Sequence, residues 1–302
     1  MLKSRLCIAF FAFAVGCAPA QKPLTDYVNP MLGTATLWDS VDLGFKPTKR
    51  TWGAEVFPGS SLPNAMVQVS PVTKFHSGAG YQYEDSVIYG FTHTNKGHWN
   101  LCHIPLLPVT GTPTPGDYCS PFSHERESAA PGYYQVFLDR YGVDAQLSST
   151  LRCAFHKYTY PAGAAASLLA DLQRSNEHVR AWDIRKEGDN VFAGWQQTGE
   201  KMYFYAVANR PVTGIEPVVE GDREVRIVRF GEGDGALELR IGFSFVSEKN
   251  ARENLEAEML GKSFAEVRSE ATATWNDLLG RSRGCSIRAS TVRSSGRRCA
   301  AT

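Results

Sequence analysis

The sequence lacks a large excess of charge of either sign. Its 302 residues include 32 lysines and arginines and 31 aspartates and glutamates, which gives a formal net charge of +1. Proteins that bind nucleic acid or anionic surfaces usually carry a concentrated basic face. The balance of charge therefore excludes nucleic acid as an expected partner and favours a neutral one.

Several patterns of common enzyme folds are also missing. Strands and helices do not alternate in a βαβ rhythm, which disfavours Rossmann and TIM-barrel architectures. Ser120, His124 and Glu125 lie close together in the sequence, but no GxSxG nucleophile elbow accompanies them. A serine hydrolase is therefore not expected.

No histidine or cysteine pattern has the spacing of a zinc site. His93, His98 and His103 recur every five residues, which matches neither a helical i, i+4 pair nor a zinc motif. The odd number of cysteines in the body of the chain allows one internal disulfide at most. These cysteines are Cys102, Cys119 and Cys153.

The first twenty residues have the order of a secretory signal peptide. A basic start is followed by an apolar run from Leu6 to Val15 and by small residues around Ala18–Ala20. The run is too short for a comfortable membrane span. We expect export to the periplasm, the outer membrane or the extracellular space, either by cleavage after Ala20 or with a lipid anchor at Cys17.

The middle of the chain predicts a mostly β fold. Residues 26–110 are rich in Gly, Pro, Ser and aromatic residues, which is typical of long loops carried on short strands. After Pro131-Gly132, alternating runs separated by turn residues favour an antiparallel β-sandwich. The predicted strands are Tyr133–Asp139, Val143–Ser149, Leu151–Tyr160, Ser167–Asp171, Val191–Gln197, Met202–Asn209, Glu224–Phe230 and Ala236–Val246.

A helical region is predicted from Asn250 to Gly280. Gly261-Lys262 predicts a break, after which Ser263 would be the N-cap of a second helix. This second helix carries an apolar stripe, which we expect a following domain to cover. The stripe consists of Phe264, Val267, Ala271, Trp275, Leu278 and Leu279.

Residues 281–302 differ from the rest of the chain. They contain six arginines and five serines and almost no apolar period. Such a segment cannot bury enough surface to order itself. We interpret it as a disordered tail or the product of a shifted reading frame, with a basic binding tail as the alternative.

Several segments resemble the N-terminal domain of glycoside hydrolase family 92. The likeness extends from about Asp26 to Gly280, nearly the whole of the predicted mature chain. The segments are YVNPMLGT (Tyr27–Thr34), FPGSSLPNAMVQVSP (Phe57–Pro71), GYQYEDSVIYGFTHT (Gly80–Thr94), IPLLPVTG (Ile104–Gly111), SHERESAAPGYYQVFL (Ser123–Leu138) and LSSTLRCAFHKYTYP (Leu147–Pro161).

The resemblance implies an exo-acting, inverting α-mannosidase of bacterial type. In such enzymes an N-terminal β-sandwich precedes a helical (α/α) barrel, which holds the catalytic carboxylates and the ligands of a calcium ion. Family members continue well beyond the position of Gly280, so we expect this chain to lack the catalytic domain and to be inactive alone. The alternative is a non-catalytic carbohydrate-binding or orphan structural module. The expected divisions are residues 1–20 (signal peptide), 26–249 (β-sandwich), 250–280 (linker helices) and 281–302 (tail).

No catalytic residue is predicted in the chain itself. An inverting glycosidase needs two carboxyl groups ~6.5–9.5 Å apart. Glu84 and Asp85 are adjacent acids in the loop-rich region, but neighbours on a strand point to opposite faces and make a poor acid/base pair.

Sugar binding is the better prediction for residues 81–100, with mannose-containing glycans as the partner. Aromatic rings cover the apolar faces of sugars, and short polar groups meet their hydroxyls. The alternatives are a core or interface position for Trp99 and Tyr81, a structural role for His93 and a turn cap by Asp85. NKGHWNLCH (Asn95–His103) departs from the family's glycine-rich loop, so the linkage preference stays open. The predicted substrate-binding residues are Trp99, His93, Asn95, His98, Asp85 and Tyr81.

Overall fold

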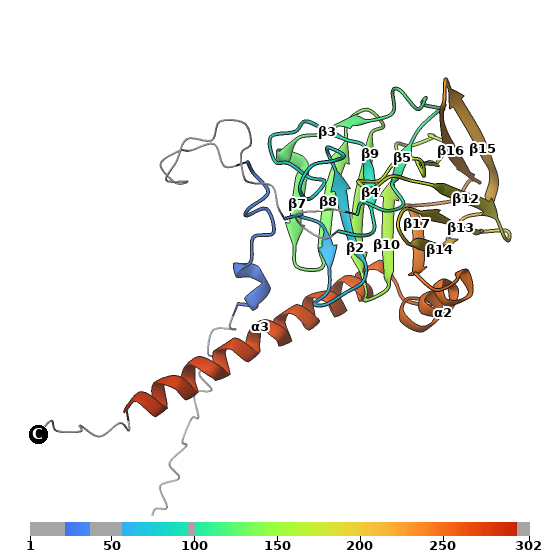
Figure 1. The fold of residues 1–302 in the computed structure, drawn as a ribbon. Coiled ribbons are helices and arrows are strands. Elements are labelled where there is room, and N and C mark those ends of the chain that lie inside the picture. The colour runs from blue at the N-terminus through green and yellow to red at the C-terminus, as the bar shows by residue number, and fades with distance from the viewer. Residues whose placement is uncertain (1–21, 37–55, 96–100, 295–302) are drawn as a thin grey trace, which may run out of the picture.

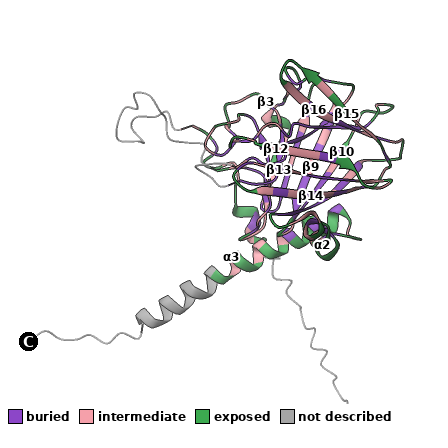
Figure 2. Cartoon of the chain, turned by 45° about the vertical axis from the view of Figure 1, so that its right-hand side comes forward, coloured by how far each residue is buried: buried purple, intermediate pink, exposed green. Residues whose placement is uncertain are grey.

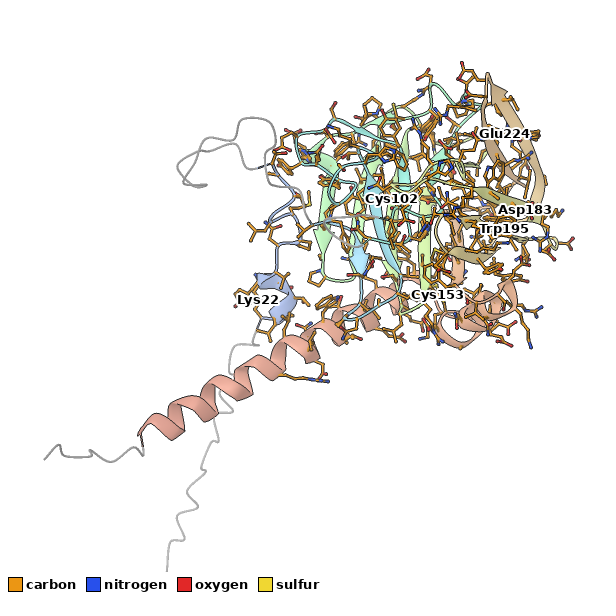
Figure 3. The ribbon with its side chains drawn as sticks, viewed as in Figure 1. Lys22, Cys102, Cys153, Asp183, Trp195 and Glu224 are labelled. Atoms are coloured by element: carbon orange, nitrogen blue, oxygen red, sulfur yellow. The ribbon has the colours of Figure 1, made fainter. Side chains whose placement is uncertain are left out.

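The computed structural model describes residues 22–36, 56–95 and 101–294, the last of these from 282 onward as backbone only. The predicted signal segment and Cys17 lie outside the described residues. Within the described ranges, no helix is both long enough and apolar enough to cross a membrane. No disulfide joins Cys102, Cys119 and Cys153, and Cys102 and Cys153 lie well apart in Figure 3.

Two large antiparallel sheets make up most of the described chain (Figure 1). A further pair of short strands, β3 (Val87–Ile88) and β6 (Ser120–Pro121), lies apart from both. The seven-stranded sheet has the order β1 (Ser60–Ser61), β2 (Gln68–Val72), β4 (Gly90–Thr92), β5 (Leu106–Val109), β11 (Ser167–Ala170), β16 (Arg223–Phe230) and β15 (Val212–Glu220). The eight-stranded sheet has the order β12 (Ala181–Lys186), β13 (Val191–Gln197), β14 (Lys201–Ala208), β17 (Leu237–Ser244), β10 (Cys153–Thr159), β9 (Val143–Ser149), β8 (Tyr133–Leu138) and β7 (Glu127–Ala130).

The two sheets share one hydrophobic core. Along β14, buried and half-buried residues alternate, as expected for a strand with one face in the core. The Phe91 ring of β4 meets the rings of Tyr134 and Tyr158 from the other sheet, with centroids 6.5 and 6.3 Å apart. Figure 2 shows the buried residues gathered in the strands. The predicted mostly β, antiparallel fold is confirmed.

Two helices follow the sheets and cover part of the outer face of the eight-stranded sheet. Helix α2 (Glu248–Glu258) packs on β17, where Gly242 permits a very close approach. A Cβ atom on Gly242 would lie 2.1 Å from the carbonyl oxygen of Ala251. Any residue with a side chain at position 242 would therefore prevent α2 from packing this closely on β17.

Helix α3 (Phe264–Ser294) begins where the sequence predicts it. Gly261 has φ +82°, which ends the preceding turn, and Ser263 and Glu266 form a reciprocal capping box. The predicted end of this helix at Gly280 is wrong, because α3 continues to Ser294. The segment that follows Gly280 contains one glycine and no proline up to Ser294, so nothing in it forces the backbone to stop.

The expectation that a following domain covers the whole apolar stripe of α3 is also wrong. Phe264 and Val267 are 5% and 1% exposed because they pack on outward-facing Tyr133 and Phe155 of the sheet. The sequence pattern hid this second apolar surface, which lies on the outer face of β8 and β10. Farther along the stripe, Leu278 is 38% exposed.

Candidate functional site

The loop that follows β11 ties together the two segments that carry the predicted sugar-binding residues. Asn176 accepts a hydrogen bond from the backbone N–H of His76 (2.7 Å) and donates one to the carbonyl oxygen of Ser77 (3.2 Å). Its own backbone N–H donates to the carbonyl oxygen of Leu101 (3.2 Å). Residues far apart in the sequence thus form one junction.

A pocket of about 580 Å³ lies beside this junction. Asp85 lines it, half-buried, and its Oδ2 accepts a hydrogen bond from Thr73 Oγ1 at 2.7 Å. Glu84 lines the same pocket, but its carboxylate accepts hydrogen bonds from the backbone N–H and the hydroxyl of Thr36. Asp85 is therefore the predicted residue that the fold places most directly at a cavity, where its carboxylate could accept hydrogen bonds from ligand hydroxyls.

Tyr81 lies inside the core and does not line this pocket. Its ring is 0% exposed, and its hydroxyl donates to Glu127, 3.0 Å from each carboxylate oxygen. Tyr134 donates to the same carboxylate at 2.5 Å, and His124 Nδ1 lies 2.6 Å from it. Burial raises the pKa of Tyr81, so its hydroxyl stays a donor. Tyr81 is thus held in the core by Glu127, and a stacking contact between its ring and a sugar would require the core to open.

His93 belongs to a buried chain of hydrogen bonds. Its Nδ1–H donates to the carbonyl oxygen of Ile104 (2.8 Å), so its Nε2 accepts from Nε2–H of His156 (3.0 Å). His156 Nδ1 in turn accepts from the hydroxyl of Tyr158 (2.5 Å). Burial lowers the pKa of His93 to about 3 and that of His156 well below its ordinary value. Both rings are therefore neutral and fixed in orientation.

Asn95 is the last described residue before positions 96–100, which include two more of the predicted sugar-binding residues. Its side-chain amide donates to the carbonyl oxygen of Ala79 (3.0 Å), and its backbone N–H donates to Gln68 Oε1 (2.8 Å). His98 and Trp99 lie outside the described residues. Sugar binding by Asn95, His98 and Trp99 stays a prediction.

Backbone strain gathers around the same junction. His76, Cys102 and Ile104 have φ values of +62°, +50° and +54°, a region that side-chain-bearing residues rarely adopt. Each such residue costs on the order of 1–3 kcal/mol and persists where its surroundings fix it. Ile104 is fixed at both ends, because its N–H donates to Gln196 Oε1 (2.8 Å) and its carbonyl accepts from His93. Strain of this kind is often found at functional sites.

Arg174 is a member of the site that the sequence analysis missed. Its guanidinium lies over the rings of Phe75, Tyr89 and Tyr118, between 5.2 and 5.9 Å from their centroids. The side chain is 34% exposed and lines the pocket of Asp85. The available signal was the polar run that begins at Asp171, directly after a buried strand, but its aromatic partners lie far away in the sequence.

Asp171 anchors this arginine cluster from behind. Its buried Oδ2 accepts from the Tyr118 hydroxyl (2.7 Å) and from Arg223 (2.8 Å), and Arg174 Nε lies 3.8 Å away. Burial raises the pKa of Asp171, and the hydrogen bond from Tyr118 and the two arginines oppose that rise. The guanidinium of Arg174 is thus held in place while part of it faces solvent.

The described residues do not fit the calcium ion that the family resemblance implies. Within these ranges, no group of three or more histidine, cysteine, aspartate and glutamate side chains is arranged to hold a metal ion. Calcium prefers six to eight oxygen ligands, largely from carboxylates. No calcium site is therefore assigned to this part of the chain.

Comparison with known proteins assigns the chain to a family. The model of the glycosyl hydrolase family 92 N-terminal domain matches residues 27–254. A curated relative from Arthroderma benhamiae, described as an uncharacterized secreted glycosidase, is 24% identical over an alignment of 307 positions, which covers 84% of this chain and 38% of the relative. This chain thus spans 38% of the length of that relative.

Solved structures agree with the family match. A family GH92 α-mannosidase from Bacteroides thetaiotaomicron superposes with a TM-score of 0.75 at 25% identity, over 86% of this chain and 38% of that one. Its complex with mannoimidazole gives the same TM-score at 26% identity. A family GH92 inverting mannosidase from the same organism has a TM-score of 0.72 at 22% identity, covers 86% of this chain and 36% of its own, and supports the fold alone.

Proposed function

The chain belongs to glycosyl hydrolase family 92 through that family's N-terminal domain, and from this premise we propose that it forms part of the substrate pocket of an exo-acting α-mannosidase. The observation that carries the proposal is the likeness to one α-mannosidase from Bacteroides thetaiotaomicron, whose two structures match at 25% and 26% identity, the second of them in complex with mannoimidazole. The proposed substrates are glycans that end in mannose.

The pocket beside Asp85 is the part of the chain that we assign to the sugar. Asp85 supplies hydroxyl acceptors, and Arg174, at the same pocket, supplies donors. We also propose sugar contacts by Asn95, His98 and Trp99, with Trp99 as the stacking residue. In carbohydrate-binding sites, aromatic rings usually cover the apolar face of a sugar and polar groups bind the hydroxyls at its edge.

We propose that catalysis and calcium binding belong to residues beyond the region that this chain shares with its relatives. The chain would then release no mannose by itself. We further propose that it is exported with residues 1–20 as a signal peptide or with a lipid anchor at Cys17, which agrees with the description of the Arthroderma relative as secreted. Residues 26–249 are the proposed sugar-binding domain, 250–280 its linker and 281–302 a tail.

Calorimetric titration and a mannose-release assay test the proposal. We expect the chain to bind methyl α-mannoside in preference to methyl α-glucoside and to release no mannose from mannan. Asp85→Asn should weaken binding about tenfold, since a carboxylate that accepts from ligand hydroxyls is worth ~1.5–3 kcal/mol. Asp139→Asn is the matched control, because the side chain of Asp139 is exposed and pairs with the equally exposed Arg126. Equal affinity for both glycosides would contradict the proposal.

A further inference from the structure

We propose that Gln196 is a positioning residue of the pocket of Asp85, because it holds the backbone from which the side chain of Arg174 extends. The inference rests on the proposed function, in which Arg174 donates hydrogen bonds to a bound mannose. Gln196 does not itself line the pocket, so it acts only through the residues that it holds.

The side chain of Gln196 connects the two large sheets. Gln196 lies in β13 of the eight-stranded sheet and is 0% exposed. Its amide contacts the backbone at Ile104, just before β5, and at Leu172 and Arg174, just after β11. Strands β5 and β11 are neighbours in the seven-stranded sheet. One buried amide therefore joins the loop that ends at Ile104 to the loop that carries Arg174.

The three backbone groups around Gln196 require one acceptor and two donors. Oε1 of Gln196 accepts from the N–H of Ile104 at 2.8 Å. Its Nε2 donates to the carbonyl oxygens of Leu172 at 2.9 Å and Arg174 at 2.8 Å. A primary amide supplies this combination, whereas a carboxylate has no donor and lysine and arginine have no acceptor. Both hydrogens of Nε2 are used, which fixes the orientation of the amide.

The contact with Ile104 holds a residue in a strained conformation. Ile104 has φ +54°, a conformation that persists only where the surrounding structure fixes it. Next to it, His103 Nε2 lies 2.9 Å from the hydroxyl of Thr198, two residues after Gln196. The loop that ends at Ile104 is therefore attached to the end of β13 at two points.

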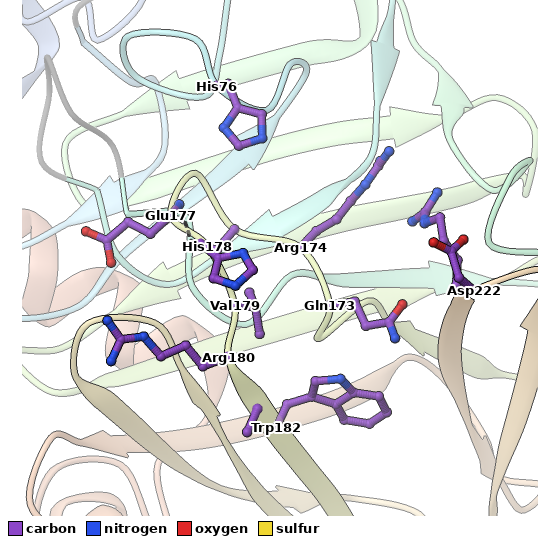
Figure 4. A pocket seen from close by; sticks show the side chains of 12 residues that line it. His76, Gln173, Arg174, Glu177, His178, Val179, Arg180, Trp182 and Asp222 are labelled. Atoms are coloured by element: carbon purple, nitrogen blue, oxygen red, sulfur yellow. Dashed lines mark hydrogen bonds between the residues drawn. The ribbon is translucent and has the colours of Figure 1, made fainter.

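The contact with Arg174 fixes the base of the arginine side chain. In Figure 4, Arg174 extends from the loop after β11 and lies between His76 and Trp182. The other end of its side chain is held by aromatic rings and by Asp171, 3.8 Å from Nε. An arginine that is held at both ends loses little conformational entropy when it binds a ligand. Removal of the amide would release the base of this side chain and so weaken binding.

Calorimetric titration of the full chain with methyl α-mannoside tests the inference. We expect Gln196→Met, which keeps the length of the side chain, to bind at least about tenfold more weakly, the loss expected when a charged donor no longer reaches a hydroxyl. Asn190→Leu is the matched control, because Asn190 also donates from its amide to a backbone carbonyl, that of Ala208 at 2.7 Å. Asn190 directly precedes β13, at the end opposite to Gln196, so Asn190→Leu should leave the affinity unchanged.

Gln196→Glu is a second variant and adds a pH profile. Its carboxylate can still accept from Ile104, but it presents no donor to the carbonyl oxygens of Leu172 and Arg174. Protonation restores one donor, and burial raises the pKa of such a carboxyl group. The affinity of Gln196→Glu relative to that of the unaltered chain should therefore recover between about pH 8 and about pH 5. The relative affinity of Gln196→Met should stay low, and a purely structural role would produce no such difference.

The outcomes separate this inference from the proposed function. If the unaltered chain binds and Gln196→Met, shown to be folded by circular dichroism, binds equally well, Gln196 is not a positioning residue and the proposed function stands. An equal loss of affinity in Asn190→Leu would also overturn the inference. If the unaltered chain does not bind methyl α-mannoside, the proposed function fails. The side-chain Nε–H signal of Arg174 in nuclear magnetic resonance then decides: a shift in Gln196→Met supports the positioning of Arg174, and an unchanged signal overturns it.

Discussion

At the level of single residues, three buried histidines link the stability of the fold to pH. Burial lowers the pKa of His93 to about 3 and that of His103 to about 4, and it lowers the pKa of His156 as well. In the unfolded chain these residues titrate near 6.5. Unfolding therefore takes up protons at any pH between these values, and acid favours the unfolded state.

The free energy of unfolding should accordingly be constant above about pH 6.5 and fall as the pH drops towards 4. Each histidine contributes up to about 1.4 kcal/mol per pH unit in this window. Urea denaturation at a series of pH values measures the slope. Replacement of both partners of the buried pair, His93→Asn/His156→Asn, should make it shallower, whereas His178→Gln, at an exposed position, should not. A slope that is the same in all three proteins would contradict this account.

Glu127 is the second residue whose burial carries a prediction. Its side chain is 1% exposed and meets Tyr81, Tyr134 and His124. Glu127→Gln should lower the free energy of unfolding by about 2–3 kcal/mol, because an amide has one acceptor atom where the carboxylate has two. The matched variant Glu256→Gln removes an exposed ion pair on α2 and should cost less than ~1 kcal/mol. Similar losses in thermal or urea unfolding would show that Glu127 is not the buried anchor described above.

The sequence predicted the region of the candidate site better than it predicted which residues line the pocket. Asp85 and Asn95 could be singled out because short polar residues interrupt an aromatic-rich segment. The pocket wall formed by Arg174 could not, because the contact of Asn176 with His76 joins residues a hundred positions apart. The burial of Tyr81 was equally hidden, because Tyr81 lies outside the strands, where no alternating pattern shows which residues face the core.

At the level of elements, local sequence pattern accounts for the inner strands of the eight-stranded sheet and fails at the edges. The predicted strands Val143–Ser149 and Val191–Gln197 coincide with β9 and β13. The edge strands β12 and β15 were not predicted. Strand β15 contains Pro217 and an exposed Val219, and an edge strand can accommodate a proline because some of its N–H groups need no partner. Strands β12 and β15 each pair with a neighbour on one side and bury few side chains, so their sequences show no alternation of apolar and polar residues.

The contact between α2 and β17 provides the prediction at this scale. Gly242→Ala should lower the free energy of unfolding by about 3 kcal/mol or more, because the new Cβ would clash with the backbone of Ala251 and push the helix outward. Gly199→Ala is the control, since a Cβ at Gly199 has nothing within 4 Å. Urea denaturation of both variants measures the difference. Equal stability would mean that α2 does not sit on the sheet as described.

At the level of the whole molecule, the two-sheet fold and the family could both be inferred from sequence. The alternating strands predicted the fold class, and the ordered segments from Tyr27 to Gly111 indicated the family. The length of α3 and the way its first turns pack on the sheet could not be inferred, because they depend on the outward-facing Tyr133 and Phe155. These residues look like any other strand aromatics in the sequence.

The central claim is that the chain presents a mannose-binding pocket wall at the junction around Asp85. The most direct test is to map, by amide chemical-shift changes in the isotope-labelled chain, where methyl α-mannoside binds. The account predicts shifts confined to residues 73–95, 101–104 and 171–176, which are absent with methyl α-glucoside and weakened by Asp85→Asn. Shifts confined to another surface, such as the outer face of β13 and β14 around Trp195 and Tyr203, would contradict it.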